Sequence, residues 1–533
     1  MLTTIVAVQL LKSIAQKVNA VDIPNPRKIH TYPIPKIGGI GMALGIFIPF
    51  IAWLPLDNSL ASILIGCAIV VTEGFIDDTR DLNYKIKFIS QIAAALVIIL
   101  YGGIKIRSLG MLLPEGFIIP EIPSILLTLF VIVGVTNAIN LSDGLDGLAG
   151  GITLLSFICI GYLAFRVENQ AVLIISMSVS GAIFGFLRFN TFPAEVFMGD
   201  AGSQLLGFLA ITLSLAITQG HTALTPILPL IILGFPVLDT LTVMVERVRN
   251  GRPPFAADKN HFHHKLMKLG LYHSEAVFSI YVLQTFLISA ALYLKYYSAI
   301  VVLLLYSAFS IVVLAGFNIA EKNNIILKRY DLIDVVIKGK LRKLKDSQFF
   351  IKIFFGVIKY GLPVLLIIAS LTPAKIPLQF SLVAISLAAC VSWVLWFKEQ
   401  WLANILRIVI YFSIPYLIYL GQNNKSQWMN GEITIIYHTL YILMLISIVM
   451  TLKSTRRKKG FKINPTDFLI LFIAIVVPNL PGVKVMQAGF IVMKIIILMF
   501  GYEVLIGELR SRLKWLSSAT AVSMVIICIR GLL

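Results

Sequence analysis

The segment LASILIGCAIVVTEGFIDDTR, residues 60–80, sets the fold class of this chain. Residues 60–76 are largely apolar, and a helix needs roughly 17 to 25 such residues to cross a bilayer. The run closes on two adjacent carboxylates, Asp77 and Asp78. The segment therefore predicts a membrane-spanning helix that brings two negative charges to one membrane face.

Similar apolar runs recur along the chain, which has 533 residues, 58% of them hydrophobic and only 13% charged. A soluble globular protein averages about 25% charged residues. A water-soluble fold cannot bury this much apolar surface, so lipid must be the solvent for most of the chain. We predict an all-α polytopic membrane protein.

The predicted spans fall into two groups. The first group lies near residues 2–17, 38–56, 60–76, 88–104, 122–140, 148–166, 170–187, 203–218, 224–244, 276–296 and 299–319. About seven further spans are expected between residues 353 and 530. The basic stretch between the groups interleaves cations with apolar residues, which is typical of an amphipathic helix on the inner leaflet. We therefore divide the chain into an N-terminal domain (1–320), a basic cytoplasmic linker (321–352) and a C-terminal membrane region of unknown role (353–533).

Cations concentrate in alternate connections of the N-terminal domain, and the positive-inside rule places such connections in the cytoplasm. Those connections contain Lys17, Arg27, Lys28, Lys36, Arg80, Lys85, Lys87, Arg247, Arg249, Arg252, Lys259, Lys265 and Lys268. The N-terminus is therefore expected outside. Loops beside anionic lipid also account for the net charge of +19, so we expect no nucleic acid partner.

Nearly every unusual polar cluster of the N-terminal domain falls in a connection predicted to be cytoplasmic. The five segments are NPRKIHTYPIPKIGG (25–39), EGFIDDTRDLNYKIK (73–87), NAINLSDGLDGLAGG (137–151), FNTFPAEVFMGDAGS (189–203) and RPPFAADKNHFHHK (252–265). Because these loops emerge on one membrane face, we expect them to converge on a single site. A charged residue at the end of an apolar span is expensive and needs a functional reason.

The carboxylates of these segments favour a divalent cation. Asp77 and Asp78 repel each other unless a cation lies beside them, which suits Mg²⁺ and its oxygen ligands; a solvated helix end is the alternative. Asp200, which opens another span, has the same two interpretations. It is a metal ligand at a helix start whose N–H groups face phosphate, or a plain N-cap.

A second set of oxygen ligands is spaced by three residues. Asn137, Asn140, Asp143 and Asp146 line one face if their segment stays α-helical or forms a 3₁₀-helix. The glycines between and after them allow a ligand to approach the backbone closely. An ordinary Asn/Asp/Gly turn is the alternative.

A basic loop near residue 260 holds three histidines, His261, His263 and His264, with Arg252 nearby. Its spacing lacks the Cys or i,i+4 His pair of common zinc sites, so cation-assisted phosphate binding is favoured. A merely basic juxtamembrane loop is the alternative. Asp239 lies within a predicted span, where it acts either at the site or as a structural hydrogen-bond acceptor behind it.

Taken together and in order, these motifs resemble the polyprenyl-phosphate N-acetylhexosamine-1-phosphate transferase superfamily (glycosyltransferase family 4). The resemblance runs from about residue 22 to about residue 270. The HFHH form is similar to the WecA/TagO branch more than to the related MraY branch. Residues beyond about 320 have no counterpart in the short family members.

The resemblance implies a bundle of ten or eleven transmembrane helices with a cytoplasmic active site, in a bacterial cytoplasmic membrane. It implies Mg²⁺, with Mn²⁺ as an alternative, a UDP-sugar donor and a polyprenyl phosphate acceptor. Asp77 and Asp78 are implied as the catalytic pair, and Asp200, Asp143 and Asn137 as metal ligands. The implied substrate-binding residues are Asn140, Asp146, Lys87, Lys36, Arg252, His261, His263 and His264.

The expected reaction transfers GlcNAc 1-phosphate from UDP-GlcNAc to polyprenyl phosphate and releases UMP. Direct attack by the lipid phosphate and a covalent aspartyl-phosphate both stay open at this point. An MraY-like enzyme that uses UDP-MurNAc-pentapeptide is the alternative within the superfamily, and a membrane transporter is the alternative from another class. A homodimer also stays open.

Overall fold

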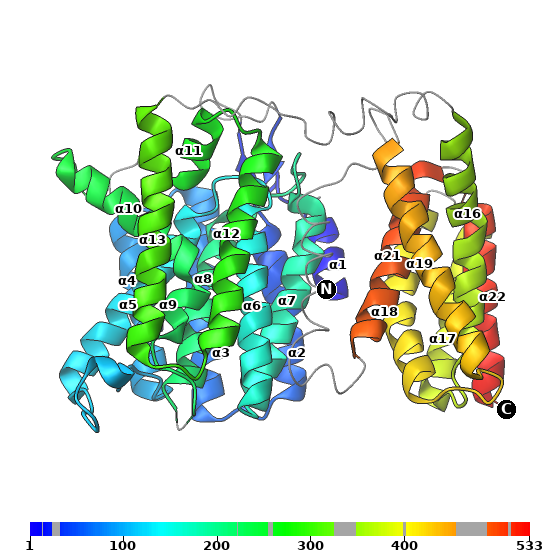
Figure 1. Ribbon diagram of the computed structural model, residues 1–533, viewed down its shortest axis with the longest axis horizontal. Helices are drawn as coiled ribbons and strands as arrows, with labels where there is room; N and C mark the ends of the chain where they lie inside the picture. Colours follow the sequence, from blue (N-terminus) through cyan, green and yellow to red (C-terminus); the bar gives the residue numbers. More distant parts are fainter. Residues whose placement is uncertain are drawn as a thin grey trace. The chain divides into compact units, whose positions relative to one another are not determined.

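A computed structural model describes residues 1–12, 14–23, 32–220, 222–253, 260–323, 348–397, 401–454, 488–509 and 513–532. These residues are helical almost throughout (Figure 1), apart from a two-stranded hairpin and short connections. Thirteen of the described helices are long and apolar enough to cross a membrane, and two shorter ones are also apolar. The predicted class, an all-α polytopic membrane protein, is confirmed.

The chain divides into two compact units, one formed by the described residues of Met1–Lys328 and one by those of Arg329–Ile463 and Asp467–Leu533. Most of the basic linker (324–347) and all of the segment 24–31, with its Arg27 and Lys28, lie outside the described residues. Each unit is therefore considered by itself.

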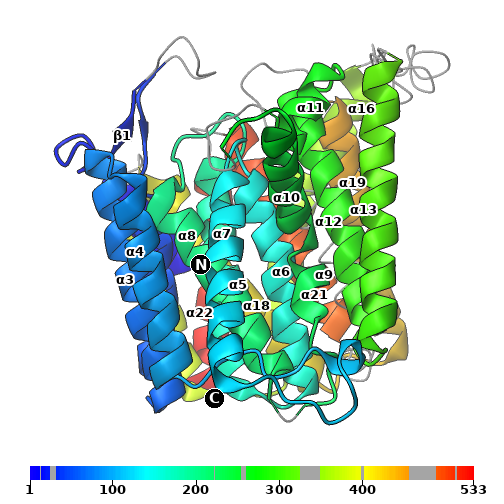
Figure 2. The same cartoon turned by 90° about the vertical axis from the view of Figure 1, so that its left-hand side faces the viewer.

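The N-terminal unit contains the helices that carry the predicted site. They are α1 (Leu2–Lys12), α2 (Gly38–Trp53), α3 (Asn58–Arg80), α4 (Tyr84–Leu96, continued by a π-helical turn at Val97–Tyr101), α5 (Glu121–Leu141), α6 (Leu148–Arg166), α7 (Gln170–Asn190), α8 (Gly199–Thr218), α9 (Leu228–Ile232), α10 (Gly234–Arg249), α11 (Phe262–Lys268), α12 (His273–Leu294) and α13 (Ala299–Lys322). Strands β1 (Val21–Asp22) and β2 (Ile34–Pro35) pair antiparallel. Figure 2 shows this hairpin and α11 at the same end of the unit.

Glycines allow three helices of this unit to meet at their ends. A Cβ on Gly39 of α2 would lie 2.2 Å from the backbone nitrogen of Gly202 in α8. A Cβ on Gly74 of α3 would lie 2.5 Å from the Cα of Ala201. Because no side chain separates these backbones, the end of α3 that carries Asp77 and Asp78 lies directly against the start of α8.

Two predicted spans differ from the structure. The first helix ends at Lys12, before the predicted end at residue 17. The span predicted at 224–244 is broken at Leu233 into α9 and α10. Pro236 has no N–H to bond the carbonyl of Ile232; that carbonyl instead accepts from the Ser156 hydroxyl (3.0 Å) and the Gln284 amide (2.8 Å). Side chains thus satisfy the backbone where the helix is interrupted.

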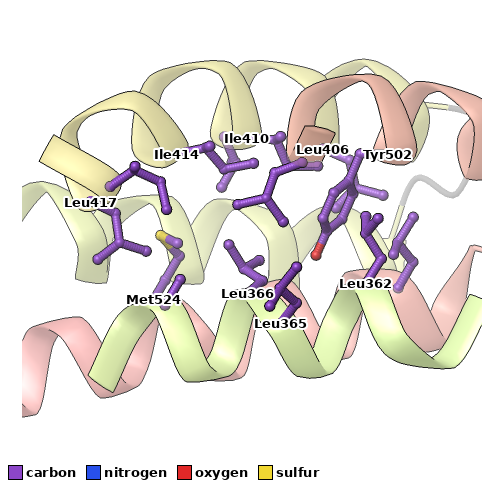
Figure 3. Packing of buried hydrophobic residues seen from close by; sticks show 14 of the residues in the cluster. Leu362, Leu365, Leu366, Leu406, Ile410, Ile414, Leu417, Tyr502 and Met524 are labelled. Atoms are coloured by element: carbon purple, nitrogen blue, oxygen red, sulfur yellow. The ribbon is translucent and has the colours of Figure 1, made fainter. Parts of the chain in front are cut away.

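The C-terminal unit is a separate helical bundle. Its described helices are α16 (Gln348–Leu371), α17 (Leu378–Phe397), α18 (Leu402–Asn423), α19 (Gly431–Ser454), α21 (Ala488–Leu509) and α22 (Lys514–Leu532). Leucine, isoleucine and aromatic side chains fill its core, among them Leu366, Ile410 and Tyr502 (Figure 3). Of the roughly seven predicted spans, any that falls on residues 455–487 lies outside the described residues.

Candidate active site

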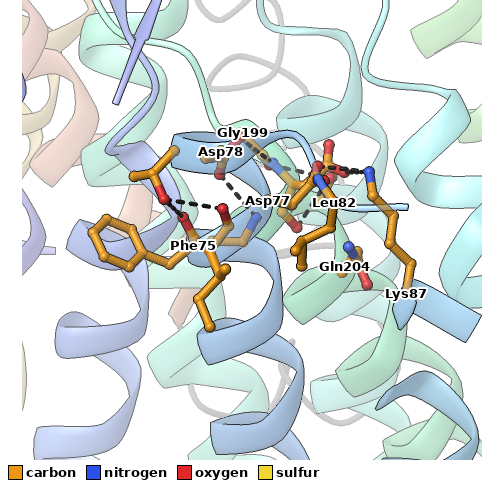
Figure 4. A network of polar contacts seen from close by, with 12 residues as sticks. Phe75, Asp77, Asp78, Leu82, Lys87, Gly199 and Gln204 are labelled. Carbon is orange, nitrogen blue, oxygen red and sulfur yellow. Dashed lines mark hydrogen bonds and ion pairs between the residues drawn. The ribbon is translucent and has the colours of Figure 1, made fainter. Parts of the chain in front are cut away.

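Three helices of the N-terminal unit bring two carboxylates to one lysine. Lys87, in the first turn of α4, places its Nζ 2.6 Å from an Asp77 oxygen at the end of α3. The same Nζ lies 2.7 Å from an Asp200 oxygen in the first turn of α8. Figure 4 shows this network, in which the second Asp77 oxygen accepts from the backbone N–H of Leu82 at 2.7 Å. The carboxylates are therefore fixed at one point, although they are 123 positions apart in the sequence.

Asp78 points to the start of α8 and caps it. Its two oxygens accept from the backbone N–H groups of Asp200 (3.0 Å) and Ala201 (3.2 Å). Gly199, at φ +69°, leaves room for this contact, because a Cβ there would lie 2.3 Å from the Asp78 carboxylate. The prediction that these N–H groups face a phosphate is wrong: a carboxylate from another helix already accepts from them. Asp200 is not the N-cap either, because α8 begins at Gly199 and Asp200 lies within its first turn.

The predicted polar column at residues 137–146 is interrupted. Helix α5 ends at Leu141, so Asn137 and Asn140 lie on it while Asp143 and Asp146 lie in the following turn. The Asn137 amide bonds with Gln91 of α4 (2.6 Å) rather than with a carboxylate. The segment does not continue as one helical face, and the alternative interpretation, a glycine-rich turn, describes residues 142–147.

The turn at residues 142–147 is held by groups from α7, from α12 and from the connection between α7 and α8. The Asp146 carboxylate accepts from the backbone N–H of Ala194 at 2.9 Å, and the Asp146 N–H donates to His273 Nε2 at 3.1 Å. The Asn190 side chain accepts from the Gly147 N–H (2.9 Å), and the Tyr281 hydroxyl donates to the Gly147 carbonyl (2.6 Å). The structure thus gives Asp146 a part in positioning this turn.

Asp143 is the free carboxylate of the turn. Its side chain makes no hydrogen bond within the part of the chain that the structure describes. Burial, with the nearby charges of Asp200 and Asp146, raises the pKa of Asp143 to about 7. Such a carboxyl is well suited to exchange a proton for a cation near neutral pH.

The histidine loop is anchored by the buried carboxylate of Asp239. Asp239 of α10 accepts from the Phe262 N–H at 2.7 Å, and its other oxygen lies 2.9 Å from His261 Nδ1. His263 packs against the carboxylate-bearing turn, because a Cβ on Gly144 would lie 2.4 Å from its Nε2. Burial, followed by the charge of neighbouring His264, lowers the pKa of His263 to about 3. His263 is therefore neutral at pH 7 and offers a hydrogen bond rather than a charge.

The remaining predicted residues lie around this centre. Lys36 follows β2 and lies 3.8 Å from Asp22, within electrostatic reach of Asp78 and Asp200. The ring of His264 lies 4.2 Å from that of His263. Arg252 is exposed after α10, and Lys259 falls outside the described residues. The structure therefore groups Asp77, Asp78, Lys87 and Asp200 tightly and leaves Arg252 at the periphery.

A divalent cation fits this arrangement with few protein ligands. No group of three His, Cys, Asp or Glu side chains within the described ranges has metal-binding geometry. Asp77 and Asp200 nevertheless place one carboxylate oxygen each within hydrogen-bonding distance of the Lys87 Nζ, the position that a metal ion would take from this ammonium. Mg²⁺ commonly takes one or two carboxylates and completes its shell with water and substrate phosphate. The residues present are compatible with that coordination.

Comparison with known proteins gives the family. The family model described as glycosyl transferase family 4 matches residues 60–218, which include Asp77, Lys87, Asp143 and Asp200. A probable undecaprenyl-phosphate N-acetylglucosaminyl 1-phosphate transferase of Bacillus subtilis is 34% identical over 333 residues, which cover 62% of this chain and 92% of the relative. This chain belongs to the glycosyl transferase family 4 superfamily. The resemblance seen in its motifs is confirmed.

Two further relatives support the same family 4 membership. The undecaprenyl-phosphate alpha-N-acetylglucosaminyl 1-phosphate transferase of Escherichia coli O157:H7 is 34% identical over 271 residues, or 50% of this chain and 74% of the relative. A decaprenyl-phosphate N-acetylglucosaminephosphotransferase of Mycobacterium leprae is 34% identical over 311 residues, with 52% and 77% covered. These alignments leave more than a third of this family 4 chain unmatched.

Several polar residues around the family 4 site were not singled out from the sequence. They are Glu73, Gln91, Asn190, Gln204, His273 and Tyr281. A search for polar residues one helical turn from a predicted ligand would have found Glu73, Gln91 and Gln204. No comparable signal marks Tyr281, because its contact with Gly147 joins positions 134 residues apart.

Proposed function

We propose that this protein transfers GlcNAc 1-phosphate from UDP-GlcNAc to a polyprenyl phosphate and releases UMP, with a divalent cation at Asp77 and Asp200. The observation that carries the proposal is the convergence of these carboxylates on Lys87, at 2.6 and 2.7 Å. The three relatives support it, because their names describe transfer of N-acetylglucosaminyl phosphate to undecaprenyl or decaprenyl phosphate.

The main difficulty of this reaction is that one anion must attack the phosphorus of another. A phosphate monoester has its second pKa near 6, so the lipid phosphate is largely a dianion at neutral pH. An oxygen of this dianion forms a bond to the sugar-linked phosphorus, and the bond to the oxygen retained by UMP breaks. Charge neutralisation therefore matters more than strong base catalysis.

The chain supplies both cationic and neutral donors for this task. Lys87 is positioned to bind diphosphate oxygens, and neutral His263 can donate one hydrogen bond without adding charge. A bound Mg²⁺ or Mn²⁺ supplies further neutralisation of the non-bridging oxygens. Either Asp77 or Asp78 takes any residual acceptor proton, and all four of their oxygens already accept hydrogen bonds in the described structure.

The proposed setting is a bacterial cytoplasmic membrane with the site on the cytoplasmic face. Support comes from the cations of the predicted inner loops, two of which, Lys36 and Lys87, lie in or near the site. We also propose that Asp143, whose charge interacts with that of Asp200, holds the cation through a water molecule, because no three such side chains among the described residues have metal-binding geometry. Asn137 is better placed to hold Gln91 than to bind the metal.

The test is UMP release by the purified full chain with UDP-GlcNAc, undecaprenyl phosphate and Mg²⁺. We expect release with UDP-GlcNAc, none after chelation of the metal, and little with UDP-MurNAc-pentapeptide. Preference for the pentapeptide donor would replace the proposal by an MraY-like activity. No release with any UDP-sugar, together with solute flux in proteoliposomes, would leave the transporter alternative.

The position of bond cleavage gives a second check. Because the attack is at phosphorus, the bond between the sugar C1 and its oxygen survives. With ¹⁸O in that position of the donor, we expect the label in the lipid product and not in UMP. Label in UMP would contradict the proposed route.

A further inference from the structure

A second polar layer lies one helical turn away from the carboxylate–lysine cluster. Each of the three helices that supply the cluster carries another polar side chain four residues away, on the same helical face. The pairs are Asp77 and Glu73 on α3, Lys87 and Gln91 on α4, and Asp200 and Gln204 on α8. Because the spacing is four residues on all three helices, Glu73, Gln91 and Gln204 form an inner polar layer. The outer layer is the cluster of Asp77, Lys87 and Asp200.

The inner layer is buried, and the carboxylate of one of its members lacks a hydrogen bond of normal geometry. Glu73, Gln91 and Gln204 are 6%, 3% and 0% exposed. Gln91 donates to Gln204 at 2.9 Å and also bonds with Asn137. Among the described residues, neither carboxylate oxygen of Glu73 nor the amide nitrogen of Gln204 makes a hydrogen bond of normal geometry, although the two side chains lie close enough to interact. A carboxyl in this position inside a membrane span requires a reason.

Lys87 is the cation that can satisfy Glu73. An ammonium group has three donors, and in the described structure Lys87 uses two of them, on Asp77 and Asp200. Glu73 is within electrostatic reach of Lys87. One helical turn of α3 corresponds to roughly 6 Å, which a flexible lysine side chain can span.

We propose that Glu73 is a positioning residue that serves as the alternative ion-pair partner of Lys87. When a divalent cation binds Asp77 and Asp200 before the donor, the ammonium of Lys87 is repelled by the cation and turns to Glu73. The diphosphate of a bound UDP-sugar then attracts Lys87 back. The Gln204 side chain already interacts with the Glu73 carboxylate in the described structure and stays beside it in both states. This inference rests on the proposed function in one respect, namely that Asp77 and Asp200 hold the cation.

The test is Mn²⁺ binding by the full chain in detergent, measured without donor or acceptor by electron paramagnetic resonance of free Mn²⁺. Four proteins are compared: wild type, Glu73→Gln, Lys87→Gln and the double variant. Without Glu73, Lys87 stays on the metal carboxylates and competes with the cation, so we expect affinity to fall about tenfold, a common size for coupled equilibria. In the Lys87→Gln background the competitor is gone, and Glu73→Gln should then change affinity less than twofold.

The double-mutant comparison separates this role from a general charge effect. An equal loss of affinity in both backgrounds, or no loss in either, would overturn the proposal. Glu73→Asp should recover part of the affinity. Glu503→Gln, which removes a part-buried glutamate from an apolar helix of the other unit, is the matched control and should bind Mn²⁺ like the wild type.

Asp200→Asn distinguishes failure of this inference from failure of the proposed function. Loss of Mn²⁺ binding in Asp200→Asn would support the metal position, and the Glu73 variants then decide the inference alone. Unchanged Mn²⁺ binding in Asp200→Asn would remove the proposed metal position and the inference with it.

Discussion

Each unit has a glutamate inside an apolar helix, and the two glutamates differ in their hydrogen-bond partners. Glu503 of α21 accepts from the Arg407 Nε with both oxygens, at 3.0 and 3.2 Å, and also bonds with the Tyr411 hydroxyl. Glu73 of α3 makes no hydrogen bond of normal geometry among the described residues. The C-terminal unit therefore neutralises its carboxylate within the protein, whereas the N-terminal unit leaves one available.

The lysines of the two units show the same contrast. Lys494 is 3% exposed and closed off by Gln422 at 3.1 Å and by the rings of Tyr437 and Tyr441 at 4.8 and 5.8 Å. Such contacts stabilise a buried cation without any ligand. Lys87 instead bridges two carboxylates from different helices. The contacts of Lys494 and of Glu503 satisfy both charges within the C-terminal unit. In the N-terminal unit, Asp77 and Asp200 share one lysine, and this excess of carboxylates supports the proposed cation site.

The largest expected effect is on enzyme activity, which should depend on the carboxylates of the N-terminal unit and not on those of the C-terminal unit. Asp200→Asn should lower UMP release by at least about 100-fold, the scale of losing one group that stabilises developing charge. Glu503→Gln should leave release within about twofold, because its partners lie in the other unit. Both variants must elute as monodisperse proteins with wild-type detergent-bound size. If Asp200→Asn and the wild type released UMP at equal rates, the active site would not be at Asp200.

The apolar spans and the order of the motifs could be predicted from the sequence because both are local. The run before Asp77 and the glycine-rich segment after Asn137 each signal their own structure. The hydrogen-bond partners of the polar residues could not be predicted from the sequence, because those partners depend on how helices far apart in the chain pack together. Asp78 was expected at the chemical step, and the structure shows it capping α8.

The same limit applies to the inner polar layer. In the sequence, Glu73 is one polar residue within an apolar span. Only the packing of α3 against α8 and α4 shows that Gln204 and Gln91 lie at the same depth in the bundle. The break between α9 and α10 was missed for a related reason. Pro236 signals a weakness in the helix, but only the contacts of Ser156 and Gln284 with the freed carbonyl show that the break is stable.

A smaller effect tests the Asp78 contact at the start of α8. Gly199→Ala should destabilise the N-terminal unit by about 1–3 kcal/mol, since it strains a positive-φ position and forces a Cβ against Asp78. Gly116→Ala is the matched control, because Gly116 has φ +78° and nothing within 4 Å of a Cβ. Thermal unfolding in detergent measures both. Equal shifts would show that the strain alone matters and that the Asp78 contact does not.

A third substitution tests whether the C-terminal unit depends on its paired charges. Glu503→Gln leaves the guanidinium of Arg407 without its carboxylate and should destabilise that unit. The side chains are about one-fifth exposed, so solvent screening reduces the expected loss to about 1–2 kcal/mol. The double variant Arg407→Met/Glu503→Leu should lose less, because it removes both charges. A greater loss in the double variant would contradict the argument.

The smallest expected effect is a pH dependence of Mn²⁺ affinity in the N-terminal unit. The pKa of Asp143 is raised to about 7, so this carboxyl is largely protonated below pH 7 and must lose its proton to bind a cation. Mn²⁺ affinity, measured without substrates, should therefore rise between pH 6 and 8, by no more than about tenfold per pH unit. Asp143→Asn should bind more weakly and with a flatter pH dependence. An unchanged slope in Asp143→Asn would assign the titration to another group and leave Asp143 outside the metal site.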